Sequence, residues 1–244
     1  MSNIAVIIPS RLNAERLPNK PLKLINKKEM ILHVYDVAKN SNVGEVIVAT
    51  PDQEILDLIK NYNGLAVLTS NKHETGTDRV FEVFEKKLKS TPEIIINFQG
   101  DMPNLNPQVI KDLAEHMKKN LCDIGTLASH IENDFEEKDS NVVKVLVAND
   151  IKNRFFAEAV DFFRTSNEPL SKFTYHHIGI YAFTNKALIR YVSLNRSKLE
   201  IERNLEQLRA LEDKMKIDVG YIDDCPLSVD TEADLVAVKK VMER

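Results

Sequence analysis

The sequence has little cysteine and no long apolar segment, and each absence excludes a class of protein. Its two cysteines, Cys122 and Cys225, are too few for a disulfide framework and fit a reducing compartment. No apolar run approaches the roughly 18 residues that a membrane-spanning helix needs, and the N-terminus carries no signal-peptide pattern. These features predict a soluble, cytoplasmic protein without membrane insertion.

The motifs of two common ligand sites are also missing. The first glycine is Gly44, so the chain lacks the GxGxxG turn that a dinucleotide-binding dehydrogenase places after its first strand. Neither HxH nor CxxC spacing occurs. The adjacent His176 and His177 fall on a predicted strand, where they point to opposite faces. The spacing of these residues therefore predicts no zinc site.

Positive charge is concentrated near the N-terminus of an acidic chain. The 244 residues carry a formal net charge of −4 with a pI near 5.9, which disfavours general nucleic-acid binding. Residues 1–30 nevertheless hold six Lys or Arg against two Glu, a local charge of +4. Such a distribution suits a focused site for a small anionic substrate.

A basic loop follows the first predicted strand. Residues 5–8 are apolar and predict a buried parallel strand. Arg11, Arg16 and Lys20 come next, and prolines on both sides of Lys20 disfavour one helix through all three. Ligands of open α/β sheets bind at the carboxyl ends of strands, so three cations there suit a triphosphate. The alternative is a solvated basic loop.

Apolar periodicity predicts alternating strands and helices in the first half of the chain. Strands are expected at 5–8, 45–50, 65–69 and 93–98, and helices at 29–41, 52–62 and 78–88. This alternation predicts a mostly parallel sheet with right-handed crossovers.

The second half has a different pattern. A helix is expected at 107–119, strands at 122–130, 141–150, 154–163 and 175–184, helices at 185–194 and 198–213, a strand at 217–221 and a last helix from Glu232. The first three of these strands follow one another without a long helix between them, which predicts antiparallel additions to the sheet. Ser197 and Glu200 have the spacing of a capping box.

The segment HETGTDRV, residues 73–80, is a candidate ligand-binding turn. Gly76 frees the backbone to approach a ligand, and Thr77 can cap a helix that begins at Asp78. The N–H groups at that helix start would favour an anion or the edge of a base. The alternative is an ordinary capped loop.

Two aspartates follow short apolar runs. Asp101, in FQGDMP, comes directly after the strand predicted at 93–98, and Asp230 lies in LSVDTEADL. Two carboxylates at strand ends can share a divalent cation, as phosphoryl and nucleotidyl transfer require. The alternatives are a Gly-Asp turn at Asp101 and helix capping by Thr231 beside Asp230.

The helix predicted at 198–213 carries two further polar candidates. Leucines at every third position make its core stripe and leave Glu206 and Gln207 beside that stripe. By spacing alone, such residues are solvated more often than functional.

Seven segments together resemble one enzyme family. In chain order they are RLNAERLPNKPL, HETGTDR, FQGDMP, NVVKV, YHHIGIY, LEQLRALE and SVDTEADL. Over nearly the whole chain, their order and separations are similar to those of the 3-deoxy-manno-octulosonate (Kdo) cytidylyltransferases, or CMP-Kdo synthetases. The resemblance implies a nucleotide-diphospho-sugar transferase fold, a three-layer α/β/α sandwich with a mostly parallel sheet and antiparallel additions, usually found as a homodimer. It also implies Mg²⁺-dependent conversion of CTP and Kdo to CMP-Kdo and pyrophosphate, for lipopolysaccharide biosynthesis.

The same resemblance assigns roles to residues that match the family motifs. The triphosphate would be held by Arg11, Arg16 and Lys20. The rest of the nucleotide would be held by Thr75, Gly76, Thr77, Arg79, Gln99 and Gly100. Magnesium would bind to Asp101 and Asp230, which form the catalytic set together with Lys20 and Arg11. The sugar acid would be held by Gln99, Arg164, His177, Tyr181, Glu206 and Gln207.

The resemblance implies a single cytidylyltransferase domain over residues 1–244. Its nucleotide-binding part would cover about 1–120 and 222–244, and its sugar-binding and dimerisation part about 121–221. Three positions depart from the family pattern, among them His176, which replaces an Arg often seen there. Asn19 replaces a common Gly, and Asn tolerates left-handed backbone angles. Met102 replaces a common Glu, which leaves a modified Kdo, such as an 8-amino form, or another acidic sugar as alternative substrates.

Other functions share parts of this pattern. A sialic-acid cytidylyltransferase has the same fold and reaction but typically carries a glycine-rich GSK first loop, which this chain lacks. A non-catalytic sugar-nucleotide-binding regulator would keep the pocket but not the metal, and the presence of Asp101 and Asp230 argues against it. For Arg164, the alternative to sugar binding is an ion pair with Glu158 or Asp161.

Overall fold

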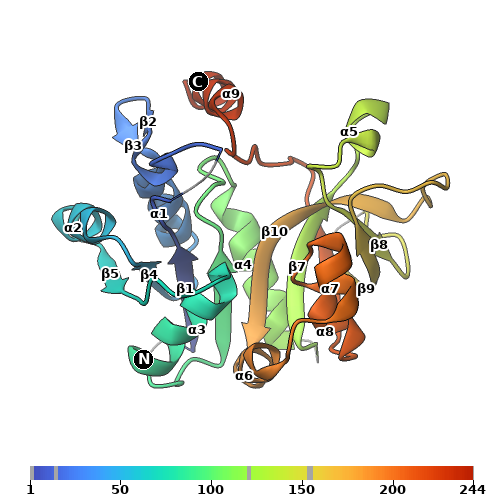
Figure 1. Ribbon diagram of the computed structural model, residues 1–244, viewed down its shortest axis with the longest axis horizontal. Coiled ribbons are helices and arrows are strands. Elements are labelled where there is room, and N and C mark those ends of the chain that lie inside the picture. The colour runs from blue at the N-terminus through green and yellow to red at the C-terminus, as the bar shows by residue number, and fades with distance from the viewer. Residues whose placement is uncertain (1–2, 14–15, 120–121, 153–155, 244) are drawn as a thin grey trace. The chain divides into compact units, whose positions relative to one another are not determined.

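A computed structural model describes residues 3–13, 16–119, 122–152 and 156–243 (Figure 1). The chain forms two compact units. Unit 1 consists of Met1–Ala114 and Pro226–Arg244, and unit 2 of Glu115–Cys225. Within the described ranges, each helix is too short or too polar to cross a membrane.

Unit 1 is built on parallel strands. They are β1 (Ile4–Pro9), β4 (Glu45–Thr50), β5 (Leu65–Leu68) and β6 (Ile94–Phe98), in the order β5-β4-β1-β6. Each neighbouring pair is parallel, as the sequence predicted. Strands β1 and β6 are buried along their whole length, which explains their continuous apolar sequences.

The connections in unit 1 reverse direction between β1 and β6. Helices α1 (Met30–Asn40) and α2 (Gln53–Asn61) lead from β1 through β4 to β5, whereas α3 (Gly76–Lys86) leads from β5 back past β1 to β6. In open parallel sheets, ligands bind outside the carboxyl ends of the strands at such a switch point. The residues after Pro9 and Phe98 therefore occupy the expected place for a ligand site.

Short elements that the sequence did not predict follow the basic loop. They are the 3₁₀ helix η1 (Lys20–Leu22) and the antiparallel pair β2 (Leu24–Ile25) and β3 (Lys28–Glu29). Asn19, just before η1, has a φ of 55°, the left-handed conformation that asparagine tolerates. A small core joins this segment to the last helix, α9 (Glu232–Met242). Its buried members are Leu17, Ile25, Met30, Val229, Leu235 and Val238.

Unit 2 contains the other strands of the mixed sheet. They are β7 (Ile124–Ser129), β8 (Lys144–Val147), β9 (Phe156–Phe163), β10 (Thr174–Thr184) and β11 (Ile217–Tyr221). Their order is β10-β7-β11-β9-β8, and β10 also pairs with β8, so the order returns to its first strand. The pairs are antiparallel apart from β11 with β7, which is parallel. The predicted antiparallel additions are confirmed, but their closure was not predicted.

The helices of the second half agree with the sequence prediction except in two regions. Those placed as expected are α4 (Pro107–Lys119) and α6 (Asn185–Ser193), and a short α5 (Asp134–Lys138) was missed. The single helix predicted at 198–213 is wrong, because the structure has α7 (Lys198–Arg203) and α8 (Leu208–Glu212). Asn204 ends α7 in a left-handed conformation with φ 51°. Positions 154–155 of the strand predicted at 154–163 lie outside the described residues.

Candidate functional site

Within unit 1, Lys20 lies between the two aspartates that the sequence singled out. Its Nζ is 3.1 Å from Oδ1 of Asp230 and 3.5 Å from Oδ2 of Asp101. The same ammonium group donates to the Val229 carbonyl at 2.9 Å. The Val229 amide in turn donates to the Asp101 carbonyl at 2.9 Å, which holds the two aspartate-bearing segments side by side. Two carboxylates from distant parts of the sequence thus share one cation.

The surroundings of Asp101 act on the pKa of its carboxyl in opposite directions. Burial raises the pKa of the Asp101 carboxyl above its usual value, the Lys20 ammonium lowers it, and the Asp230 carboxylate raises it again. The donor set itself indicates which cation the pair suits, because carboxylate oxygens are the hard ligands that Mg²⁺ prefers. Asp101 and Asp230 therefore fit a magnesium ion.

The other cations of the basic loop are more exposed than Lys20. Nη2 of Arg16 lies 3.0 Å from Oδ2 of Asp230, and 57% of the Arg16 side chain is exposed. Arg11 is exposed at the carboxyl end of β1. Its charge acts on Arg79. Burial lowers the pKa of the Arg79 guanidinium, and the positive charge of Arg11 lowers it further. The structure thus brings Arg16 and Lys20 to Asp230 and places Arg11 near Arg79.

The start of α3 differs from the prediction by two residues. The helix begins at Gly76, and its cap is Thr75, whose Oγ1 accepts from the Asp78 amide at 3.1 Å. The Asp78 carboxylate accepts from the Thr75 amide at 3.3 Å, which completes a capping box. The prediction that Thr77 caps a helix starting at Asp78 is therefore wrong. Thr77 is buried and accepts a hydrogen bond from Asn97 at 3.2 Å.

Gln99 and the two glycines pack against the end of β1. A Cβ atom added to Gly76 would lie 3.3 Å from Cγ of Pro9 and 3.5 Å from Oε1 of Gln99. One added to Gly100 would lie 3.2 Å from the Pro9 carbonyl oxygen. The Gln99 amide group donates to Oδ1 of Asn97 at 3.0 Å, and both its oxygen and its nitrogen lie beside Gly76. Sequence reasoning missed Asn97, although a polar residue inside the apolar run IIINF was a visible signal.

Side chains of α3 fix the loop that precedes it. Arg79 is 3% exposed, and its Nη1 donates to Oγ1 of Thr69 at 2.5 Å and to the Ser70 carbonyl at 3.0 Å. One turn later, Oε2 of Glu82 accepts from the Ser70 amide at 2.8 Å and lies 2.5 Å from Nε2 of His73. Burial raises the pKa of Glu82, but these hydrogen bonds outweigh it and bring the value down to about 2. The Arg79 side chain thus uses Nη1 to hold the loop at Thr69 and Ser70.

In unit 2, Arg164 is held by backbone carbonyls. Its Nη1 donates to the Ser140 carbonyl at 3.0 Å and its Nη2 to the Asn204 carbonyl at 3.5 Å. The alternative partner Asp161 instead accepts two hydrogen bonds from Arg203, at 2.7 and 2.9 Å. Arg164 and Arg203 line an open cavity of about 550 Å³. A cation therefore lines this cavity, and Asp161, one of the two partners in the alternative interpretation of Arg164, is paired with Arg203 instead.

A buried lysine that the sequence analysis did not single out supports Arg164. Lys144, on β8, has an exposed fraction of 0%, and its Nζ donates to three carbonyl oxygens. They belong to Asp139 at 2.6 Å, Val142 at 3.0 Å and Arg164 at 2.7 Å. Burial lowers the pKa of Lys144. Its signal in the sequence was a charge inside the apolar run VVKVLV.

His177 is a neutral, buried histidine. Burial, with a smaller effect of His176, lowers its pKa to about 3. The Thr126 hydroxyl uses its one hydrogen toward the Ile180 carbonyl at 2.7 Å, so at 3.0 Å it must accept from Nε2 of His177. The Nδ1 atom of His177 is then an acceptor.

The remaining sugar-site candidates lie beside this histidine. The Tyr181 ring is 5.4 Å from the His177 ring, and burial, with the nearby Glu206 charge, raises the pKa of Tyr181 well above its usual value. The Glu206 carbonyl accepts from the Tyr191 hydroxyl at 2.9 Å. Gln207 is 6% exposed, so it is not the solvated residue that spacing alone favoured. Unit 2 thus brings His177, Tyr181 and Glu206 together.

Comparisons with known proteins identify a family. A family model described as cytidylyltransferase matches residues 5–217. A 3-deoxy-manno-octulosonate cytidylyltransferase from Bartonella tribocorum is 39% identical over 241 residues, covering 97% of each chain. One from Rhodopseudomonas palustris is 41% identical over 238 residues, covering 97% of this chain and 96% of that one.

Solved structures give the same result. A CMP:2-keto-3-deoxy-manno-octonic acid synthetase complexed with CTP is 34% identical, covers 98% of both chains and superposes with a TM-score of 0.88. A 4-diphosphocytidyl-2C-methyl-D-erythritol synthase from Anaerococcus prevotii is 15% identical with a TM-score of 0.66, which shows likeness of fold alone.

Proposed function

Because this chain belongs to the 3-deoxy-manno-octulosonate (Kdo) cytidylyltransferase family, we propose that it converts CTP and Kdo to CMP-Kdo and pyrophosphate. The observation that carries the proposal is the cluster of Lys20, Asp101 and Asp230 in unit 1. It combines a cation for phosphate oxygens with two carboxylates for a metal. The product is the activated sugar for lipopolysaccharide biosynthesis.

The chemistry requires placement of charge more than covalent catalysis. The anomeric hydroxyl oxygen of Kdo attacks the α-phosphorus of CTP, the bond to the β-phosphate breaks, and pyrophosphate leaves while the hydroxyl proton is released. Both substrates are anions, so their repulsion must be offset by fixed cations and by alignment. Arg11, Arg16 and Lys20 would hold the triphosphate for this in-line displacement.

We also propose that the enzyme uses Mg²⁺, held by Asp101 and Asp230. A magnesium ion would neutralise phosphate oxygens as negative charge develops on them. The proposal is supported by the hard donor set and by the hydrogen bond that joins the two aspartate-bearing segments. Lys20 already contacts both carboxylates, so its ammonium group is placed to move between them and a phosphate.

The base would be recognised by the start of α3 and the Gln99 amide. A helix N-terminus offers N–H donors, and the Oε1 atom of Gln99 offers an acceptor on the same side as Gly76. Together they match a base edge that carries both acceptors and a donor. Thr75, Thr77, Arg79 and Gly100 would shape this turn.

The sugar acid would be bound by polar residues of unit 2. Arg164 is the cation for the Kdo carboxylate, because a guanidinium can hold a carboxylate by two parallel hydrogen bonds. His177 would accept a hydrogen bond from a sugar hydroxyl through Nδ1. Tyr181, Glu206 and Gln207 complete the polar set.

Three further proposals concern the arrangement of layers in the fold, the oligomeric state and the cellular location. The reversal of the crossovers in unit 1 supports a three-layer α/β/α arrangement, since right-handed connections put α1 and α2 opposite α3. The family resemblance supports a homodimer, which light scattering can test. The presence of Cys122 and Cys225 as thiols and not as a disulfide supports a reducing, cytoplasmic location.

The reaction can be tested directly by release of pyrophosphate. Purified protein is incubated with CTP, Mg²⁺ and Kdo, and in parallel with 8-amino-Kdo in place of Kdo, because Met102, which is buried, departs from the family pattern given above. We expect pyrophosphate with a sugar acid and none without one. Absence of pyrophosphate with both sugars would overturn the proposed function, and a preference for the amino sugar would reassign the acceptor.

A further inference from the structure

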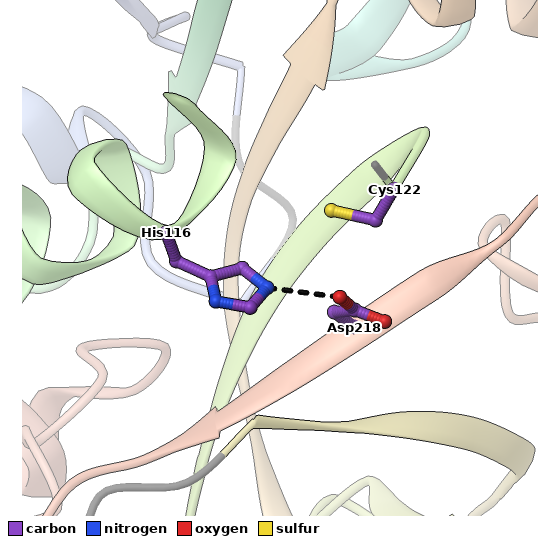
Figure 2. Close-up of side chains that lie close together, drawn as sticks. All are labelled: His116, Cys122 and Asp218. Atoms are coloured by element: carbon purple, nitrogen blue, oxygen red, sulfur yellow. Dashed lines mark hydrogen bonds and ion pairs between the residues drawn. The ribbon is translucent and has the colours of Figure 1, made fainter. Parts of the chain in front are cut away.

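Three potential metal ligands that the proposed reaction does not use converge in unit 2 (Figure 2). His116 comes from α4, Cys122 lies just before β7, and Asp218 is on β11. One ligand atom from each lies within 4.8 Å of the other two. Nε2 of His116 and Oδ2 of Asp218 are 2.9 Å apart.

These separations are close to those of a tetrahedral metal site. Zinc binds nitrogen, sulfur and oxygen at about 2.0 to 2.3 Å, which places tetrahedral ligands roughly 3.3 to 3.8 Å from one another. A change of about 1 Å in side-chain position would therefore let all three groups reach one ion. A backbone rearrangement is not needed.

Contacts outside the cluster already orient its members. The His116 ring stacks on the Phe156 ring with centroids 3.6 Å apart and planes 7° from parallel. Oδ1 of Asp218 lies 3.5 Å from Nζ of Lys216, which leaves Oδ2 directed to His116. Supporting contacts of this kind fix the ligands of metal sites.

We propose that His116, Cys122 and Asp218 bind a zinc ion. The imidazole, thiolate and carboxylate are the ligand types that zinc uses, whereas magnesium prefers oxygen alone. On binding, a sulfur–zinc bond forms and the Cys122 thiol releases its proton to solvent. The thiolate and carboxylate then offset the two charges of the ion in a buried place, where Cys122 is 6% and Asp218 8% exposed.

The ion joins three elements that only the fold brings together. It connects the end of α4 to the starts of β7 and β11, and so acts as a structural link within unit 2. The His116 side chain is 12% exposed. Asp218 is distant in the sequence from His116 and Cys122, which is why no compact zinc motif is present.

Metal binding to the full chain tests this proposal. The protein is stripped with a chelator and dialysed against Zn²⁺ in a large excess of Mg²⁺, which occupies any site made of carboxylates alone. We expect one zinc per chain by elemental analysis. Cys122→Ser and His116→Gln should each weaken zinc binding by at least tenfold, because a weaker or missing ligand replaces a strong one.

Two matched variants serve as controls. Cys225→Ser removes the other free thiol, and Asp101→Asn disrupts the proposed magnesium pair; both should bind zinc as the wild type does. Less than one zinc per chain in the wild type, or equal binding by Cys122→Ser and Cys225→Ser, would overturn the proposal.

A measurement on the wild type covers the case in which the variants do not fold. Co²⁺ can replace Zn²⁺, and a thiolate ligand then gives a charge-transfer band in the near ultraviolet. We expect this band in the wild type and its loss on addition of Zn²⁺. A cobalt-loaded protein without the band would show that Cys122 is not a ligand and would overturn the site.

Discussion

The two units hold their charged side chains in different ways. In unit 1, Lys20 contacts two loop carboxylates, that of Asp101 after β6 and that of Asp230 before α9, as well as the Val229 carbonyl. In unit 2, Lys144 contacts three backbone carbonyls and is fully buried. Charge pairs on loops can exchange partners when a ligand arrives, whereas a lysine fixed by backbone groups cannot. Substitution of Lys20 in unit 1 should therefore lower activity but leave the stability of the fold nearly unchanged. Substitution of Lys144 in unit 2 should lower both activity and stability.

The largest expected effect tests the carboxylates of unit 1. Asp101→Asn and Asp230→Asn should each lower kcat/KM by about a thousandfold, roughly 4 kcal/mol, because each removes a ligand charge from the transition state. Steady-state kinetics of pyrophosphate release measure this. Asp57→Asn, at an exposed position of α2, is the matched control. Near-normal activity of either variant would show that its aspartate is not a metal ligand.

The next effect tests the buried cation of unit 2. Lys144→Ala should lower the free energy of unfolding by about 3 kcal/mol, since three carbonyls lose their donor. It should also weaken Kdo binding, because Lys144 holds the backbone of Arg164. Urea unfolding and Kdo-dependent kinetics measure the two effects. Lys118→Ala, which changes an exposed lysine of α4, controls for loss of charge. An unchanged unfolding midpoint would remove the contrast between the units.

Removal of the Lys20 side chain in unit 1 is the counterpart of the Lys144→Ala change in unit 2. Lys20→Ala should raise the CTP concentration needed for half-maximal rate by roughly 30-fold, about 2 kcal/mol, because a charge-assisted contact to phosphate is lost. The cooperative thermal transition should remain. If that transition disappears, Lys20 is a structural residue. Lys20 and Lys144 would then both stabilise the fold, and the contrast between them would be lost.

The smallest effect concerns the geometry of a single cation. Arg164→Lys keeps the charge but removes the paired donors, so apparent Kdo affinity should fall by roughly tenfold, about 1.4 kcal/mol, with CTP affinity nearly unchanged. Kinetics with each substrate varied in turn separate the two. Arg196→Lys, at a half-exposed ion pair with Glu200, is the control. An unchanged KM for Kdo, or an equal loss for CTP, would contradict the role of Arg164.

The sequence predicted those features that depend on local pattern. Strand 45–50 and helix 107–119 were predicted with the bounds that the structure has, because apolar spacing is local. The helix at 198–213 failed because its leucine spacing continues through Asn204, whose left-handed conformation the spacing does not encode. The choice between Thr75 and Thr77 as cap was readable from the Thr75-to-Asp78 spacing but was missed.

The contacts that depend on the tertiary fold could not be predicted. The loop motifs placed Lys20, Asp101 and Asp230 as candidates, since each lies in a short segment with its own signal. The Arg164 carbonyl reaches Lys144 only through the pairing of β8 with β9, and Asp218 joins His116 and Cys122 from a distant part of the sequence. Such sites have no fixed spacing, so their detection requires coordinates.

The closed strand order of unit 2 has a consequence for aggregation. Each of its five strands has two partners, so none presents a free edge to a strand of another chain. In unit 1, β5 is paired with β4 alone among the described strands, and its Leu65 and Leu68 are 47% and 53% exposed. Intermolecular strand addition is therefore directed to β5, and a charged residue at Leu68 should suppress it without touching either set of ligand-binding residues.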